Sequence, residues 1–195
     1  MDFMIAINNK VPDFELKAYH NQSLKKIKLS KYKGKWVVLI FYPADFTYVC
    51  PTELEDAADL YNQFKKEGAE VMSISTDTEF SHKAWHDSSK AVGKVKYPML
   101  ADPLGKVTKT FGVYIGDGAN ADEGLACRGT FIIDPDGVLK TIEIHDNDIG
   151  RSMKETLRKL RAAKFVREHR GLVCPANWEE GKKTLKKGIN LIGKI

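Results

Sequence analysis

Cys50 is the residue whose position points most directly to chemistry. It follows an apolar run, residues 36–42, that is typical of a buried strand, and it directly precedes Pro51, a residue favoured in the first turn of a helix. A thiol in such a turn faces unpaired backbone N–H groups and the positive end of the helix dipole, which stabilise a thiolate. Cys50 is therefore a candidate nucleophile. The alternative is a small core residue, since free cysteine is among the residues most often buried.

The other cysteines and the histidines indicate thiol chemistry without a metal. Three cysteines with no CxxC pair argue against a disulfide-stapled secreted scaffold and favour a cytoplasmic protein with functional thiols. A general thiol–disulfide oxidoreductase would carry CxxC, whereas this chain has Glu53 three residues after Cys50. His82, His86 and His145 do not stand at zinc-ligand spacing with the cysteines, so no metal site is expected.

The segments that must position Cys50 alternate between strand and helix. Two apolar strands joined by a helix imply a parallel crossover, and an Asp-Pro-Asp-Gly turn predicts a hairpin after it. Thr52 and Glu55 have the spacing of a capping box at the start of the first helix. The expected elements are a strand at 36–42, a helix at 50–67, a strand at 71–75, a helix at 79–91, a short helix after residue 103, a hairpin at 130–144 and a helix at 150–165.

Length and composition exclude several classes of protein. A chain of 195 residues with 43% hydrophobic and 29% charged residues fits one globular domain. No apolar run approaches the ~20 residues that a membrane helix needs, and residues 1–6 do not begin a secretory signal. The net charge of +5 comes from scattered lysines with no accompanying base-contact motif, so neither nucleic acid nor a membrane is an expected partner.

The spacing Pro43-x-x-x-Thr47-x-x-Cys50, followed by Glu53, resembles the peroxidatic motif of the peroxiredoxins. The segment around Cys174, residues 171–178, resembles the resolving-cysteine segment of the typical two-cysteine subgroup. Residues 191–195 are similar to the ending of the bacterial alkyl hydroperoxide reductase C subunits within that family. Other matching segments are residues 75–78, 82–86, 128–134 and 149–151, so the likeness runs from about Val11 to Ile195.

This resemblance implies the fold and the domain organisation. The expected fold class is α/β and thioredoxin-like, with a central mixed β-sheet flanked by helices. Residues 1–165 would form the peroxidase domain, and residues 166–195 a C-terminal arm of the same structural unit that reaches a partner subunit. Members of this subgroup form homodimers that commonly assemble into decameric rings, and the chain is expected to do the same.

The resemblance also implies an enzyme, an antioxidant thiol peroxidase that reduces hydrogen peroxide and organic hydroperoxides to water and alcohols. The Cys50 thiolate would attack the peroxide and become a sulfenic acid. Cys174 of the partner subunit would resolve this acid as an intersubunit disulfide. Thioredoxin or a flavoprotein disulfide reductase would then reduce the disulfide. No bound cofactor is implied, because sulfur carries the redox change.

Five further residues are candidates for roles around the thiolate. Arg128 offers a permanently charged, planar set of donors to thiolate and peroxide, Thr47 offers a hydroxyl, and Pro43 would shield the pocket from water. Glu53 and Arg151 match a supporting ion pair of the family. Four of them have a simpler alternative: Thr47 as a helix N-cap, Arg128 in a structural salt bridge, Glu53 as a solvated first-turn carboxylate and Pro43 as a strand terminator.

Three further expectations concern reactivity. Cys127, beside Arg128, is interpreted as a spectator thiol, the alternative being a third thiol near the site. The loop at residues 116–124 lacks the Gly-Gly-Leu-Gly sequence of overoxidation-sensitive members, and the chain lacks their Tyr-Phe tail. Fast resolution of the Cys50 sulfenic acid by Cys174 and resistance to sulfinic acid formation are therefore expected.

A ring-forming holdase chaperone is the rival function from a different class.

Overall fold

The computed structural model describes residues 5–116 and 122–194. The chain divides into two compact units, Met1–Met153 and Lys154–Ile195, so the boundary falls at the start of α4 (Met153–Glu168). The division after residue 165 made from the sequence stays a prediction. The predicted loop at 116–124 and the end of the chain lie partly outside the described residues, at 117–121 and 195.

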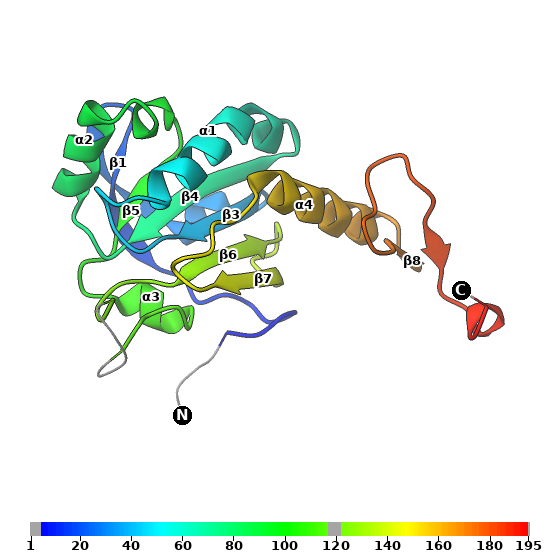
Figure 1. The fold of residues 1–195 in the computed structure, drawn as a ribbon. Helices are drawn as coiled ribbons and strands as arrows, with labels where there is room; N and C mark the ends of the chain where they lie inside the picture. Colours follow the sequence, from blue (N-terminus) through cyan, green and yellow to red (C-terminus); the bar gives the residue numbers. More distant parts are fainter. Residues whose placement is uncertain (1–4, 117–121, 195) are drawn as a thin grey trace. The chain divides into compact units, whose positions relative to one another are not determined.

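The first unit is built on a mixed sheet (Figure 1). Within the described residues this sheet has seven strands in the order β2-β1-β5-β4-β3-β6-β7. The parallel pairs are β3 with β4 and β4 with β5, whereas β6 runs antiparallel to both β3 and β7. The strands are β1 (Glu15–His20), β2 (Ser23–Lys28), β3 (Trp36–Phe41), β4 (Ala69–Ser75), β5 (Met99–Ala101), β6 (Arg128–Ile133) and β7 (Leu139–His145). The expected mixed sheet flanked by helices is confirmed.

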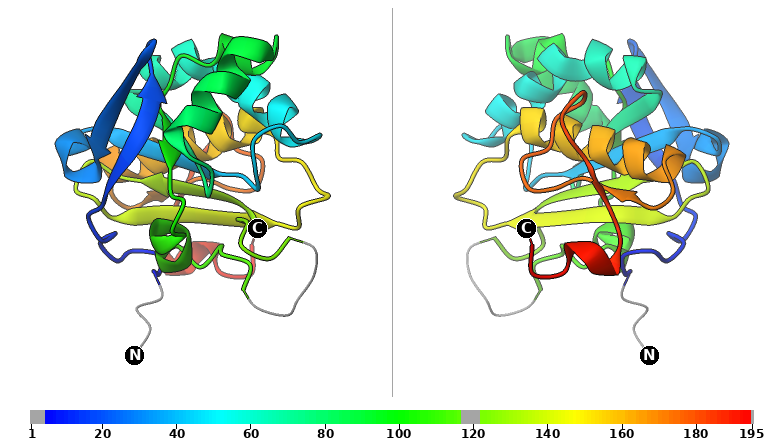
Figure 2. Two further views of the ribbon diagram at one scale, coloured as in Figure 1. Left: turned by 90° about the vertical axis from the view of Figure 1, so that its left-hand side faces the viewer. Right: turned by 90° about the vertical axis from the view of Figure 1, so that its right-hand side faces the viewer.

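Helices cover both faces of this sheet. In Figures 1 and 2, α1 (Cys50–Lys66) and α2 (Glu79–Ser88) lie on one side and the short α3 (Lys106–Thr110) on the other. The central β3 and β4 are buried along their whole length, which explains why their sequences are continuously apolar instead of alternating. The core on the α3 side includes Leu39, Phe41, Met72, Phe111 and Phe131.

Most predicted elements are confirmed within a few residues, and two differ for local reasons. The helix expected at 79–91 ends at Ser88, and a separate 3₁₀ turn, η2 (Val92–Lys94), follows it. The helix expected from residue 150 begins at Met153, because the preceding segment turns to bring Arg151 onto α1. A further 3₁₀ turn, η1 (Leu29–Tyr32), precedes β3. No helix of the described residues is long and apolar enough to cross a bilayer.

The second unit holds an aromatic cluster at the end of α4. Phe165 stacks on His169 with ring centroids 4.1 Å apart and contacts Trp178 at 5.0 Å. The indole of Trp178 donates to the carbonyl of Lys182 at 3.1 Å. These contacts order the segment between α4 and the short ladder of β8 (Leu172–Val173) and β9 (Leu185–Lys186), after which η3 (Ile189–Leu191) follows.

Candidate active site

Cys50 is the first residue of α1 and is fully buried. The central strand β3 ends at Phe41, and the connecting segment 42–49 delivers the chain to the start of this helix. Thr52 donates its hydroxyl to the carbonyl of Val49 at 2.6 Å, and the helix has no side-chain N-cap. The predicted capping box is therefore wrong, and the thiol itself stands where the helix presents its unpaired N–H groups.

Arg128 is the cation beside the thiol. Its Nη1 lies 3.5 Å from Sγ of Cys50 and 2.8 Å from Oε2 of Glu53, both in geometry for donation. Its Nε donates to the main-chain oxygen of Asn147 at 2.9 Å. Side chains alternate between the faces of a strand, so Arg128, the first residue of β6, points to the α1 side while Phe131 points to the α3 side. This alternation places the guanidinium at the buried sulfur.

Glu53 joins the two arginines of the site. Its carboxylate accepts from the main-chain N–H and from Nε and Nη2 of Arg151, at 2.8, 2.9 and 2.8 Å, in addition to the bond from Arg128. The burial of Glu53 alone would raise the pKa of its carboxyl, but the hydrogen bonds and charges of the two arginines outweigh burial and hold that pKa below its usual value. Glu53 is therefore no solvated first-turn carboxylate, and the expected ion pair with Arg151 is present.

Thr47 and Pro43 lie on the segment that leads into α1. The hydroxyl of Thr47, a half-buried residue, donates to the carbonyl of Ala44 at 2.8 Å and caps no helix, because Val49 is the N-cap residue. Its oxygen keeps its capacity to accept a hydrogen bond. Pro43 is buried. The intervening Phe46 has a left-handed backbone at φ 57°, which the surrounding contacts must hold in place.

A buried network that sequence reasoning missed holds this segment. His82 on α2 contacts the carboxylate of Asp45 through Nδ1 at 2.8 Å and the carbonyl of Leu100 through Nε2 at 3.1 Å. Tyr42 donates its hydroxyl to the other oxygen of Asp45 at 2.8 Å, and the N–H of Asp45 donates to Asp77 at 2.8 Å. Most of these contacts join segments that lie far apart in the sequence, so residue spacing gave no signal for them.

Cys127 and Arg128 are neighbours in sequence, but their side chains point in opposite directions. Cys127 is half-buried and packs against the core on the α3 side. Burial raises the pKa of its thiol, and the charges of Asp146 and Asp122 raise it further. The thiolate is the reactive form of cysteine, so this environment suits a spectator.

Cys174 belongs to the second unit and follows β8 directly. It is half-buried, and its Sγ lies 4.0 Å from the carbonyl oxygen of Ala162 in α4. Burial raises the pKa of the Cys174 thiol, and the nearby charge of Arg158 opposes this effect only in part. At neutral pH the residue is therefore chiefly a thiol.

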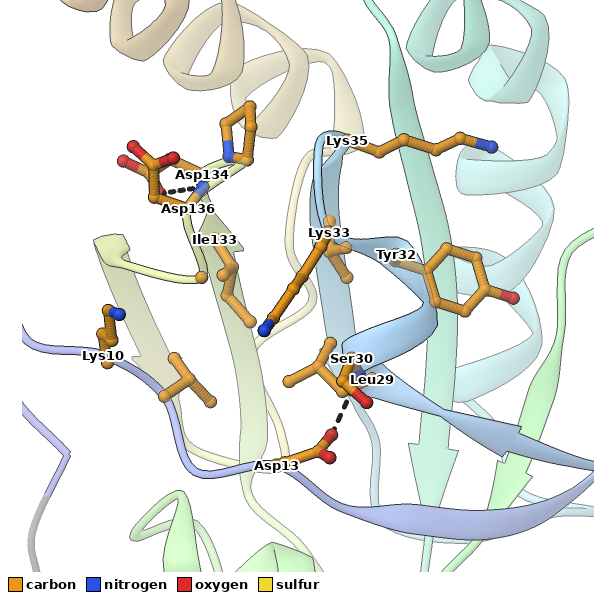
Figure 3. Close-up of a pocket in the computed structure, with 14 residues that line it drawn as sticks. Lys10, Asp13, Leu29, Ser30, Tyr32, Lys33, Lys35, Ile133, Asp134 and Asp136 are labelled. Atoms are coloured by element: carbon orange, nitrogen blue, oxygen red, sulfur yellow. Dashed lines mark hydrogen bonds between the residues drawn. The ribbon is translucent and has the colours of Figure 1, made fainter.

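A surface pocket elsewhere has no connection with these residues. It has a volume of about 250 Å³ and lies where β3 begins and β6 ends, lined among others by Leu29, Lys33, Val37 and Ile133 (Figure 3). Cys50 lies beyond the opposite end of β3, and none of the predicted site residues lines the pocket. In the described part of the chain, no group of three or more histidine, cysteine or acidic side chains could hold a metal ion.

Comparisons with known proteins show the family of the chain. Residues 7–142 match the AhpC/TSA family, and residues 162–188 match the C-terminal domain of 1-Cys peroxiredoxin. The chain is 52% identical over 192 residues to alkyl hydroperoxide reductase C of Pseudomonas aeruginosa, and 47% identical to the protein of that name from Escherichia coli K12. Both alignments cover 98% of this chain and all of the relative.

Solved structures give the same result. The crystal structure of Enterococcus faecalis AhpC matches with a TM-score of 0.82 at 45% identity, covering 88% of this chain and all of that one. Reduced 2-Cys peroxiredoxin of Plasmodium vivax matches with a TM-score of 0.84 at 30% identity, covering 91% of each chain. The mixed sheet is therefore that of a thioredoxin-like fold. On both sequence and structure, the chain belongs to the AhpC/TSA family of peroxiredoxins and is a thiol-dependent peroxidase.

Proposed function

We propose that Cys50 is the peroxidatic cysteine and that it reduces hydrogen peroxide and organic hydroperoxides. The observation that carries this proposal is the buried Cys50 sulfur at the first residue of α1, 3.5 Å from a guanidinium nitrogen of Arg128. A helix N-terminus and a fixed cation both favour the thiolate. The name of the relatives, alkyl hydroperoxide reductase C, supports organic hydroperoxides as substrates beside hydrogen peroxide.

The first step forms an S–O bond and breaks the O–O bond. The Cys50 thiolate attacks one peroxide oxygen, which becomes the sulfenic acid oxygen, while the other oxygen leaves with the electron pair of the broken bond and takes a proton. Negative charge thus moves from sulfur to the leaving oxygen. In the described residues Nη2 of Arg128 has no hydrogen-bond acceptor, whereas Nε donates to Asn147 and Nη1 donates to Glu53 and to the sulfur of Cys50. Nη2 is therefore the donor available for the charge that develops on the peroxide.

Thr47 and Pro43 complete the first step in this proposal. The Thr47 hydroxyl already donates to Ala44, so its oxygen acts as an acceptor for the O–H of the peroxide and orients the substrate. Pro43 is buried on the same segment, residues 42–49, and excludes water from the sulfenic acid. Glu53 and Arg151 do not touch the substrate in this scheme. They are positioning residues that hold Arg128 through the shared carboxylate.

The second step transfers the oxidation to Cys174. The thiol of Cys174 of the partner subunit condenses with the Cys50 sulfenic acid, which forms an intersubunit disulfide and releases water. Residues 162–188, which match the C-terminal domain of 1-Cys peroxiredoxin, contain Cys174, and the likeness to a solved 2-Cys peroxiredoxin supports this role. The scheme requires at least a homodimer, and a decamer of such dimers is part of the proposal.

An external dithiol completes the cycle by returning two electrons and two protons to the disulfide. Thioredoxin or a flavoprotein disulfide reductase would serve, since both present a reactive dithiol to a protein disulfide. A cytoplasmic location fits a cycle that depends on a reducing compartment. Rapid condensation with Cys174 would also protect the Cys50 sulfenic acid from further oxidation to the sulfinic acid.

The test is anaerobic mass spectrometry of the reduced protein after one equivalent of hydrogen peroxide, with reducing and non-reducing gels. The expected product is a disulfide between Cys50 and Cys174 that joins two chains. A Cys174→Ser variant should stop at the Cys50 sulfenic acid, which a dimedone adduct would report. An unreacted Cys50, or a disulfide through Cys127, would refute the proposal and favour a chaperone.

A further inference from the structure

The turn after β7 reaches back to the arginine of the site. Arg128 pairs with His145 across the β6–β7 ladder. Asn147 follows His145 by two residues, and its main-chain oxygen accepts a hydrogen bond from Nε of Arg128 at 2.9 Å. The chain therefore leaves the sheet and passes the arginine side chain. Acceptors at Nε and Nη1, from Asn147 and Glu53, fix the plane of the guanidinium and the direction of Nη2.

The side chain of Asn147 ties this turn to a second loop. Its Nδ2 donates to Oδ2 of Asp122 at 2.8 Å, across 25 residues of sequence. Asp122 lies in the loop ahead of β6, where its main-chain oxygen accepts from the N–H of Leu125 at 3.0 Å. The opposite orientation of the amide would set its oxygen against a carboxylate, so the hydrogen-bond partner determines the orientation.

Other bonds of the turn are local and do not anchor it elsewhere. The N–H of Ile149 donates to the main-chain oxygen of Asp146 at 3.1 Å, and the N–H of Asp148 donates to the Asp146 carboxylate at 3.0 Å. These bonds shape the turn without fixing its distance from Arg128. The bond between Asn147 and Asp122 links it to a separate segment, and so bears on where the Asn147 carbonyl lies.

We infer that Asn147 is a positioning residue for peroxide reduction, holding the guanidinium of Arg128 over Cys50 through its amide bond to Asp122. The inference rests on the proposed role of Arg128. The main-chain oxygen of Asn147 accepts from Arg128, and the side-chain amide of Asn147 fixes the position of that oxygen through Asp122. Loss of the side-chain hydrogen bond therefore displaces the guanidinium of Arg128 without removing it. Displacement of a reacting group by about 1 Å can cost about 10²-fold in rate.

The test exchanges donor and acceptor between the two loops. Asn147→Asp sets two carboxylates against each other, whereas Asn147→Asp combined with Asp122→Asn restores one hydrogen bond with the direction reversed and the net charge unchanged. The single variant should oxidise Cys50 with hydrogen peroxide at least about tenfold more slowly. Its Cys50 should also need a higher pH for half-maximal alkylation by iodoacetamide, because the guanidinium no longer stays beside the sulfur. The double variant should bring both values back close to those of the wild type.

Controls separate positioning from folding. Asp148→Asn changes an exposed charge on the same turn and should leave both measurements unchanged. Asn147→Ala removes the amide without adding charge and should shift both in the same direction as Asn147→Asp, which covers the case that Asn147→Asp does not fold.

Two results would overturn the inference. The first is that both Asn147 variants oxidise and alkylate Cys50 as the wild type does. The second is that oxidation slows while the pH dependence of alkylation stays unchanged, and the double variant does not restore the oxidation rate. Wild-type protein whose Cys50 does not react with peroxide would instead refute the proposed function, so the two failures are distinguishable.

Discussion

Replacing Glu53 with glutamine tests whether the site depends on a buried charge. The variant removes the carboxylate shared by Arg128 and Arg151, whose side chains are 4% and 0% exposed, while the Glu53 side chain itself is 1% exposed. Water cannot solvate either guanidinium in place. The NH₂ group of the glutamine would also face an N–H of an arginine, so that two donors meet. Removing one partner of a buried ion pair costs about 3–5 kcal/mol, so Glu53→Gln should lower the free energy of unfolding by about that amount.

The assay is urea denaturation of reduced protein at one fixed concentration, since self-association contributes to apparent stability. Glu55→Gln is the matched control on the same helix. Glu55 pairs with Lys94 at 2.6 Å, but the two side chains are 36% and 49% exposed, so its loss should cost at most about 1 kcal/mol. A cost for Glu53→Gln as small as that of the control would refute the reasoning, because it would mean that water reaches the arginines.

The pH dependence supplies a second check of the same substitution. The arginines hold the pKa of Glu53 below its usual value of 4.5 despite the opposing effect of burial. A carboxyl with a depressed pKa contributes its stability fully above the unfolded-state value and loses it as the pH falls through the folded-state value. The stability difference between wild type and Glu53→Gln should therefore be constant from pH 6 to 8 and shrink below about pH 4.5. A difference that does not change with acidification would contradict the ionised state of Glu53.

Other perturbations have equally direct outcomes. Arg128→Lys keeps the charge but loses the planar set of donors, so the rate constant for Cys50 oxidation by hydrogen peroxide should fall by about 10² or more in stopped-flow measurements, and a near-wild-type rate would show that charge alone suffices. Because burial raises the pKa of Cys174 above its usual value of 9.0, disulfide formation should accelerate as the pH rises toward that value. A rate of disulfide formation that does not change with pH would argue against Cys174 as the resolving thiol. Cys127→Ser should retain peroxidase turnover within about twofold, since burial and neighbouring aspartates raise the pKa of that thiol.

Local patterns predicted the elements that carry the site. The apolar run of β3, the proline after Cys50 and the hairpin turn after β6 are signals that depend on neighbours in sequence, and each element lies where they indicate. The roles assigned to Thr47 and Glu53 came from family resemblance. The structure adds their partners, which exclude helix capping by Thr47 and solvation of Glu53.

The contacts that join distant segments had no such signal. Asn147 meets Arg128 through a main-chain oxygen, which any residue type would supply, so its identity carries no information about that bond. The bonds of His82 to Asp45 and to the carbonyl of Leu100 depend on how α2 is laid against the sheet. Such pairings follow from tertiary packing, which residue spacing does not encode.

The hydrogen bonds of α1 to its surroundings divide that helix into a body that is held in place and a first turn that can unwind. From Glu53 onward, hydrogen bonds fix the helix to its surroundings. Glu53 accepts from Arg128 and Arg151, and the carbonyl of Leu54 accepts from the hydroxyl of Tyr97. Asp56 accepts from the N–H of Met153, the first residue of α4. Cys50 lies ahead of all these attachments. Opening the end that bears the sulfur therefore disrupts about one turn of helix, a local fluctuation far smaller than global unfolding. Opening that went further would strip the carboxylate from both arginines. In the proposed cycle the Glu53 carboxylate would limit this opening, so that the Cys50 sulfur leaves its buried position while the rest of the helix stays folded.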